Sequence, residues 1–511
     1  MRRNVFVIIL FGLSAGYLFG AGWSASFQFR PNSFSVQTLE RDGQTFTIIN
    51  PERNAVPEHS NLQIDYVRET GKPILPCWSF ILLIPQGMKV GQVRVTEDGV
   101  TSIKAEYPPY PAQPPVPVSA SELPPLVFPE REIYQGTQPW PGERYWISPV
   151  GIKSGFRLVN IVIYPVRYDP VNGSYLISQN LRVEIEYEPD PTAEFASLTG
   201  KQLKLFSAAV KSIVINPEDV SRYAPQERSA DFGTYDYVII TNSTLEPYFQ
   251  PLLNWRRRLG YSGIIRTTSW IKSNYSGRDL PEKIRNFIRD YFNNYGTMWV
   301  LLGGDTAVVP ARRARATCAG EIGNIPCDLY YVDLQYSWDS NNDNIFGQYG
   351  VDTTDLYYDL YVGRASVDDT NQVKTFVNKV ITHESNPPTD YLRRILLVSG
   401  YLWSGYDETQ SNDSIANITP SGWSDVYIEN PGNTTMVRDS LNHGFQFCHM
   451  VGHGNDYGIY HNSTAYYSTS VISGHNNGSR VGLINSIACY PGNFEYNDCL
   501  AEASHNCATG G

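Results

Sequence analysis

Hydrophobic and polar positions follow two different patterns along this chain of 511 residues, and the pattern changes near residue 233. Before that point, short segments such as 181–187 (LRVEIEY) alternate between apolar and polar residues, and Pro- and Gly-rich turns separate them. Alternation with a period of two is typical of β-strands that bury one face. We therefore expect residues 23–187 to form an all-β, sandwich-like domain.

After residue 233, short apolar runs alternate with amphipathic segments. The first expected strands are 235–241, 263–266 and 298–302, and the first expected helices are 251–259 and 280–291. Strands that alternate with helices indicate an α/β domain in which helices flank a parallel sheet. Residues 188–232 are polar and weakly patterned, so we interpret them as a linker between the two domains.

Two later apolar runs, residues 445–451 and 481–488, also have the length and boundaries of buried strands. Each run leads into a reactive side chain: His453 stands in a Gly-His-Gly, and Cys489 directly follows the second run. If the two strands are neighbours and parallel, both side chains emerge at the carboxyl edge of the sheet, where ligands bind in open α/β folds.

A cysteine and a histidine at one sheet edge can form a nucleophilic pair. A free thiol has a pKa of roughly 8.5, so it is mostly protonated at neutral pH and needs an imidazole as base or ion-pair partner. His453 can supply that imidazole to Cys489, and the N–H groups of Gly454 and Cys489 can donate to an oxyanion. The alternative, from spacing alone, is a Gly-rich turn beside a packed cysteine, which is the commoner use of these residue types.

The same residues resemble the active-site region of the gingipain-like cysteine peptidases, a family with a caspase-like fold. That family places its catalytic His in a Gly-His-Gly after an apolar strand and its nucleophile in an Ala-Cys one strand later, followed by a helix start that residues 499–503 (CLAEA) match. The resemblance implies that His453 is the base, Cys489 the nucleophile and Gly454 an oxyanion donor. It also implies that residues 233–511 are a caspase-like peptidase domain, truncated where the next core strand of the family would begin.

The N-terminal half resembles the propeptide of gingipain-like precursors. The phrase at 71–76 (GKPILP), followed by a strand and then by PQG at 85–87, carries this similarity. The resemblance implies a zymogen whose own propeptide assists folding and inhibits the peptidase. Arg222 or Arg228 in the linker is then a candidate for the bond cut on activation. A plain β-sandwich binding module is the alternative for this half.

Two features depart from the family pattern. Better-known members carry an acid just after the strand at 395–399 to orient the histidine, and this chain has Gly and Tyr there. Asp407 or Glu408 can replace that acid from a longer loop, or a backbone carbonyl can orient the ring. Asp413 lies near the position that places a carboxylate in the S1 pocket of arginine-specific members, which implies cleavage after basic P1 residues.

Residues 338–347 (WDSNNDNIFG) carry oxygen-bearing side chains at alternate positions, namely Asp339, Asn341 and Asp343. The spacing resembles the first half of a calcium loop, but no Glu stands at the twelfth position. A structural Ca²⁺ ion and an Asx-rich turn are therefore equal alternatives for this segment. The chemistry of a Cys-His pair requires no cofactor.

The N-terminus has the form of a secretory signal, because Arg2 and Arg3 precede an apolar stretch at 5–19 and small residues follow. We expect residues 1–22 to be removed; the alternative is a retained anchor, although the stretch is shorter than the roughly 20 residues that span a bilayer. Beyond this signal no transmembrane segment is expected, so the mature protein is expected to be secreted, extracellular or at the cell surface. The net charge of −11 argues against a nucleic-acid partner.

The chain has seven cysteines, and setting Cys489 aside as a thiolate leaves six. Cys318 with Cys327 is the most local pair that could form a disulfide, but the sequence leaves the connectivity open.

The function that these observations favour is an exported cysteine endopeptidase, made as a zymogen, that acts on proteins and peptides. The alternative is a surface adhesin that keeps the caspase-like scaffold without catalysis. The adhesin is favoured by the expected truncation and by the absence of an acidic residue just after the strand at 395–399. The intact pair of His453 and Cys489 favours the enzyme.

Overall fold

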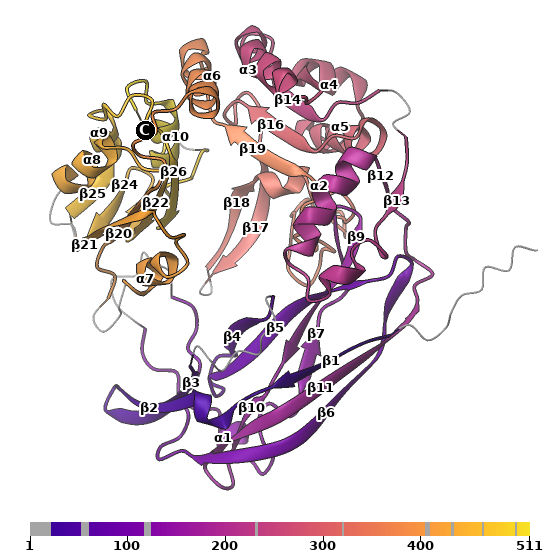
Figure 1. Ribbon diagram of the computed structural model, residues 1–511, viewed down its shortest axis with the longest axis vertical. Helices are drawn as coiled ribbons and strands as arrows, with labels where there is room; N and C mark the ends of the chain where they lie inside the picture. Colours follow the sequence, from indigo (N-terminus) through magenta and orange to yellow (C-terminus); the bar gives the residue numbers. More distant parts are fainter. Residues whose placement is uncertain are drawn as a thin grey trace, which may run out of the picture.

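The computed structural model describes residues 22–52, 61–116, 124–229, 233–318, 321–403, 409–430, 434–461, 464–495 and 498–510. These residues form a strand-rich N-terminal domain and two α/β units (Figure 1). The N-terminal domain lies at the bottom of the view, and the two units lie side by side above it, with the C-terminal unit in yellow. No described helix has the length and apolar character needed to cross a membrane.

Two sheets and a hairpin make up the N-terminal domain. One sheet contains β1 (Gly22–Gln28), β6 (Met88–Lys104), β10 (Val166–Asp169) and β11 (Ser174–Pro189), and the other contains β4 (Gln63–Val67), β5 (Leu75–Ile84), β7 (Tyr145–Ile147), β8 (Gly151–Lys153) and β9 (Phe156–Ile163). Strands β2 (Phe34–Arg41) and β3 (Gln44–Pro51) form the hairpin, and α1 (Arg131–Tyr134) is a single helical turn. The buried rings of Phe27 in β1 and Phe80 in β5 lie 5.4 Å apart, so the two sheets share one core. The expected strand-rich half is confirmed, with one short helix in addition.

Part of the expected linker is folded, and that interpretation is wrong for residues 197–227. This stretch contains β12 (Ser197–Leu198), α2 (Gly200–Lys211) and β13 (Gln226–Glu227). The ring of Phe206 in α2 is buried and contacts the rings of Phe292 and Tyr361 in the first α/β unit. The sequence pattern hides this helix because a second buried position, Gln202, is polar and interrupts the apolar stripe. The side-chain amide of Gln202 donates to the carbonyl of Phe292.

The first α/β unit is built on a parallel sheet in the order β15-β14-β16-β19. Its strands are β14 (Tyr237–Thr241), β15 (Gly263–Thr267), β16 (Trp299–Gly303) and β19 (Tyr361–Ala365), and its helices are α3 (Glu246–Arg258), α4 (Thr268–Asn274), α5 (Leu280–Tyr295) and α6 (Thr370–Ser385). The expected strands and helices are confirmed, except that α3 begins at Glu246 and holds Pro251 in its interior. Proline favours the first turn of a helix, which explains the misplaced start.

Strands β17 (Arg312–Cys318) and β18 (Glu321–Cys327) form an antiparallel hairpin after β16. In its register Cys318 lies opposite Glu321, and Cys327 lies opposite Arg312. The two cysteines are therefore at opposite ends of the hairpin, roughly 20 Å apart at about 3.3 Å per residue. A disulfide needs Cα atoms within about 7 Å, so the Cys318–Cys327 pairing is wrong. The six cysteines whose side chains the structure describes are free thiols.

The second α/β unit has a parallel sheet of its own, in the order β21-β20-β22-β26. Its strands are β20 (Arg394–Ser399), β21 (Ser424–Glu429), β22 (Phe447–Val451) and β26 (Leu483–Ile487), and its helices are α7 (Gln410–Ala416), α8 (Thr434–Asn442), α9 (Thr469–Ile472) and α10 (Leu500–Asn506). A meander of β23 (His453–Asn455), β24 (Gly458–His461) and β25 (Thr464–Ser468) follows β22. The expected single sheet is therefore two sheets, each with a separate hydrophobic core.

Three aspartates of the first α/β unit lie where it meets the N-terminal domain: Asp333, Asp355 and Asp359, which we call the acidic cluster. Burial raises the pKa of Asp333 to about 7 and that of Asp355 to about 6, and it also raises the pKa of Asp359. The charge of Asp355 adds to the rise for the other two. The folded chain therefore holds protons on these carboxyls that an unfolded chain would release.

We expect the free energy of unfolding to fall as the pH rises from about 4 to about 7. In this window the folded-state pKa values of Asp333 and Asp355 lie above the ordinary 3.8, so the folded chain binds more protons and a higher pH favours unfolding. Asp333→Asn should reduce this loss by about 1–3 kcal/mol, measured by urea unfolding at both ends of the window. Asp98→Asn, at an exposed position in β6, is the control, and equal slopes for Asp333→Asn and the parent would contradict the assignment.

Candidate active site

Strands β22 and β26 are hydrogen-bonded parallel neighbours, which confirms the arrangement expected from the sequence. Val451 lies opposite Ile487, so His453 and Cys489, each two residues further on, leave the sheet at the same edge. Their loops touch, because a Cβ atom built on Gly454 would lie 2.9 Å from the nitrogen and 2.6 Å from the carbonyl oxygen of Cys489. The structure thus brings the three predicted residues together.

A backbone carbonyl holds the imidazole of His453. Its Nε2 atom lies 3.0 Å from the carbonyl oxygen of Leu402, in the loop after β20, and the ring of Trp403 meets it edge-on at 5.9 Å. A carbonyl oxygen only accepts hydrogen bonds, so Nε2 is the nitrogen that donates in this contact. Of the alternatives raised from the sequence, Asp407 and Glu408 lie outside the described residues. Sequence reasoning could not name Leu402, because a carbonyl gives no side-chain signal.

Cys489 is a half-buried free thiol at the end of β26. The next residue, Tyr490, has a φ of +66°, in the left-handed region that non-glycine residues rarely adopt. The chain then turns back, and the N–H of Asn493 donates to the carbonyl of Tyr490 at 3.1 Å. Such a sharp, strained turn is common at functional sites, since it lifts a side chain out of the sheet edge.

The loops that carry His453 and Cys489 are tied to each other by Asp456. Its Oδ1 atom accepts a hydrogen bond from the amide of Asn493 at 2.9 Å, and its carbonyl accepts one from the N–H of Leu500, at the start of α10, at 2.7 Å. The sequence did not single out these residues, because Asp and Asn in loops usually serve only local turns. Here they fix one loop against the other.

The Cys489 loop also contacts the first α/β unit. Glu502 in α10 is buried; one carboxylate oxygen accepts the N–H of Cys499 at 3.0 Å, and the other accepts the hydroxyl of Ser366, which follows β19, at 2.5 Å. The guanidinium of Arg364 lies 4.9 Å from the ring centroid of Phe494. The candidate site is therefore supported by both units.

Two further residues lie away from Cys489. His449 in β22 is 6 % exposed, and burial lowers its pKa. Asp413 is exposed on α7, and its charge helps to raise the pKa of Tyr427 in β21, after burial and Asp425. Strand β21 is the edge opposite β26, three strand spacings or roughly 14 Å away. The structure therefore does not place Asp413 beside Cys489.

The segment considered for calcium forms a turn closed by its own side chains. Asp339 accepts the N–H of Asp343 at 2.9 Å and pairs with the guanidinium of Arg278, and the amide of Asn341 donates to Asp343 at 2.9 Å. These contacts are those of an Asx-rich turn. Among the described residues, no group of three or more His, Cys, Asp or Glu is placed to hold a metal. Calcium binding stays an untested prediction.

Comparison with known proteins assigns the chain to a family. The sequence from 230 to 511, more than half of the chain, matches Peptidase family C25. The chain belongs to peptidase family C25. Residues 24–224 match the propeptide of the same family. The resemblance to gingipain-like peptidases with an N-terminal propeptide is thereby confirmed.

Curated C25 relatives include two peptidases of Porphyromonas gingivalis. Gingipain R2 is 22 % identical over 490 residues, which cover 92 % of this chain and 61 % of the relative. Lys-gingipain is 20 % identical over 324 residues, which cover 61 % of this chain and 17 % of the relative. The chain thus spans 61 % of the length of Gingipain R2 and 17 % of the length of Lys-gingipain.

Solved structures of C25 peptidases also match. The crystal structure of the Arg specific cysteine proteinase gingipain R superposes with a TM-score of 0.43 and 21 % identity, over 56 % of this chain and 63 % of that one. The complex of the Porphyromonas gingivalis RgpB pro- and mature domains superposes with a TM-score of 0.42 and 23 % identity, over 54 % of this chain and 62 % of that one.

Proposed function

We propose that this chain is the precursor of a cysteine endopeptidase that hydrolyses proteins and peptides through Cys489 and His453. The observation that carries the proposal is the register of β22 and β26, which puts both residues at one sheet edge with the Gly454 backbone against Cys489. A thiol and an imidazole in this position meet the geometric requirement of nucleophilic catalysis.

In the proposed mechanism, the imidazole of His453 takes the thiol proton, and the Cys489 thiolate attacks the scissile carbonyl. The N–H groups of Gly454 and Cys489 then donate to the oxyanion of the tetrahedral intermediate. His453 returns its proton to the leaving amine, and water hydrolyses the thioester with His453 again as base. Throughout, the carbonyl of Leu402 accepts from Nε2–H, so it orients the ring and stabilises the imidazolium that forms.

We include a preference for basic P1 residues in the proposal. Relatives named Lys-gingipain and an Arg specific gingipain R support it. The position of Asp413 gives no support, because the exposed carboxylate lies toward the far edge of the sheet. The group that would hold a basic side chain is therefore not assigned.

We further propose that residues 24–224 inhibit the catalytic domain until the chain is cut. The propeptide match supports this, as does the relative whose pro- and mature domains form a complex. Arg222 is exposed, whereas the Arg228 guanidinium donates to the carbonyls of Ser197 and Ser229. Both stay candidates for the cut. Export through residues 1–22 is likewise a proposal, and residues 1–21 lie outside the described residues.

The proposal is tested by labelling the activated full chain with arginyl, lysyl and uncharged peptidyl chloromethyl ketones, followed by peptide mapping. We expect an adduct at Cys489 that disappears in His453→Ala, with the basic ketones reacting fastest. Cys327 is an internal control, because burial raises the pKa of its half-buried thiol. If Cys489 stays unlabelled after the propeptide has been cut away, the chain is a binding scaffold and not a peptidase.

A further inference from the structure

The turn between β8 and β9 carries the N-terminal domain onto the first α/β unit. Two of its backbone N–H groups donate directly to the acidic cluster. The N–H of Ile152 reaches the Oδ2 atom of Asp355 at 2.6 Å, and the N–H of Ser154 reaches the Oδ1 atom of Asp359 at 3.0 Å. Ser154 has a φ of +50°, so the turn is tight and its tip is narrow.

Lys153 stands between these two donors and is only 4 % exposed. Its ammonium nitrogen lies 3.0 Å from the centroid of the Tyr358 ring. Burial lowers the pKa of Lys153 to about 8, while the charges of Asp359 and Asp355 oppose that fall. A buried ammonium is costly unless an aromatic face or carboxylates compensate it. Here the first α/β unit supplies the ring of Tyr358 and the carboxyl groups of Asp355 and Asp359.

The surface that receives the turn is itself ordered. Asp359 also accepts the N–H of Leu334 at 2.8 Å, and Asp355 also accepts the N–H of Tyr357 at 2.9 Å, so both carboxyl groups are held in place. The fit is close, because a Cβ atom on Gly151 would lie 2.6 Å from the Tyr357 ring. The hydroxyl of Tyr336 donates to the carbonyl of Val150 at 3.0 Å.

This contact lies at the opposite end of the sheet from the candidate active site. Asp359 precedes β19, whereas Arg364, near the end of the same strand, reaches Phe494 in the Cys489 loop. In a parallel sheet these are opposite edges. The turn can therefore hold the N-terminal domain in place without occupying the site of chemistry.

We propose that residues 333–359 are a docking surface for the propeptide, and that Lys153 is the latch that keeps the cut propeptide bound there. The surface fits a β-turn that offers two backbone N–H donors with a lysine between them. When the propeptide leaves, the acidic cluster loses both N–H donors and the ammonium of Lys153. The cost of leaving these groups without their partners opposes release of the turn. The inference rests on the proposed function, since it assumes that residues 24–224 are separated by a cut.

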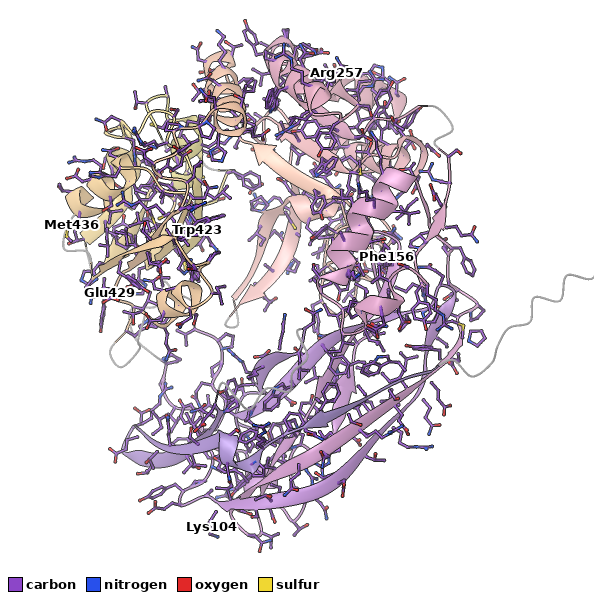
Figure 2. The ribbon with its side chains drawn as sticks, in the orientation of Figure 1. Lys104, Phe156, Arg257, Trp423, Glu429 and Met436 are labelled. Carbon is purple, nitrogen blue, oxygen red and sulfur yellow. The ribbon has the colours of Figure 1, made fainter. Side chains whose placement is uncertain are left out.

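The test uses the full chain with Cys489→Ala and a site-specific protease sequence in place of residues 230–232. After the chain is cut there, the rate at which the labelled N-terminal part leaves is followed by gel filtration with excess unlabelled cut chain as a trap. We expect Lys153→Met to speed release about 30-fold, because the buried ammonium loses its contact with the Tyr358 ring and its attraction to Asp359 and Asp355. Lys104→Met, at the far end of the N-terminal domain in Figure 2, is the matched control and should release as the parent does.

Asp355→Asn keeps an acceptor for the Ile152 N–H and removes the charge, so it tests the latch from the other side. This variant should also speed release of the N-terminal part. In the double variant with Lys153→Met, the increase in release rate should be smaller than the product of the two single increases. Equal release from Lys153→Met and Lys104→Met, or effects that simply multiply, would overturn the latch. If Lys153→Met does not fold, Asp355→Asn alone tests the proposal. Release of Asp355→Asn as slow as that of the parent would then overturn it. Because the chain is inactive, none of these outcomes depends on peptidase activity, which the ketone labelling tests separately.

Discussion

Replacing Cys489 with Ala is expected to lower kcat/KM of the activated chain on peptide substrates by about 10⁴-fold or more. The thiolate is the only group that forms the acyl intermediate in the proposed mechanism, so its loss leaves only binding and oxyanion stabilisation. His453→Ala should cost about as much, because nucleophile and base act as a unit and their effects do not add. The rates are measured with fluorogenic peptides after the propeptide has been removed.

Matched controls exist in the same α/β unit. Cys507 is a second half-buried free thiol, and His443 is an exposed imidazole at the end of α8, whose Nδ1 contacts the carbonyl of Asp439. Cys507→Ala and His443→Ala should each keep nearly the full rate. A Cys489→Ala chain that retained more than about one per cent of the parent rate would place the nucleophile elsewhere, given the size of the effect expected.

Gly454→Ala is expected to lower kcat/KM by about 100-fold or more, since loss of one oxyanion donor alone costs that much. The added methyl would lie 2.6 Å from the Cys489 carbonyl oxygen and 2.7 Å from the Cβ of Ala488, both closer than such atoms approach. The two loops must then separate, which moves the thiol away from the imidazole and the Gly454 N–H away from the oxyanion. The change should appear mainly in kcat, because the attack geometry and not substrate binding is disturbed.

Gly492→Ala is the control for this prediction. Gly492 lies in the same loop as Cys489, has no positive φ, and a Cβ there would meet nothing within 4 Å. It should therefore leave kcat nearly unchanged and the melting temperature within a few degrees of the parent. If Gly454→Ala were as active as Gly492→Ala, the close approach of the two loops would not be needed for catalysis.

The position of His453 and Cys489 at one edge of the sheet could be predicted from the sequence. Each residue follows a short apolar run, and neighbouring parallel strands bring their carboxyl ends to one edge whatever the rest of the fold does. The strand-rich N-terminal half and helix α5 were also predicted correctly, and α3 was predicted with a later start, because their periodicity is a local property of the chain.

The division into two sheets could not be predicted in this way. A β-α-β pattern looks the same whether the next strand joins the existing sheet or begins another, and here β19 and β20 belong to different sheets. Helix α2 was missed for a similar reason. Its buried Gln202 is satisfied by the carbonyl of Phe292, about 90 residues further along the chain, and such a partner leaves no mark on the local pattern.

The remaining features of the site depend on contacts between residues distant in sequence. The Leu402 carbonyl orients His453, Asp456 holds Asn493, and Asp355 receives the turn that carries Lys153. Backbone groups and single polar side chains of this kind have no characteristic spacing. The amino-acid sequence thus specifies which residues can react, through residue type and strand periodicity. Their orientation and the docking of the propeptide come from packing between segments far apart in the chain, because hydrogen bonds and burial depend on distances that exist only after folding.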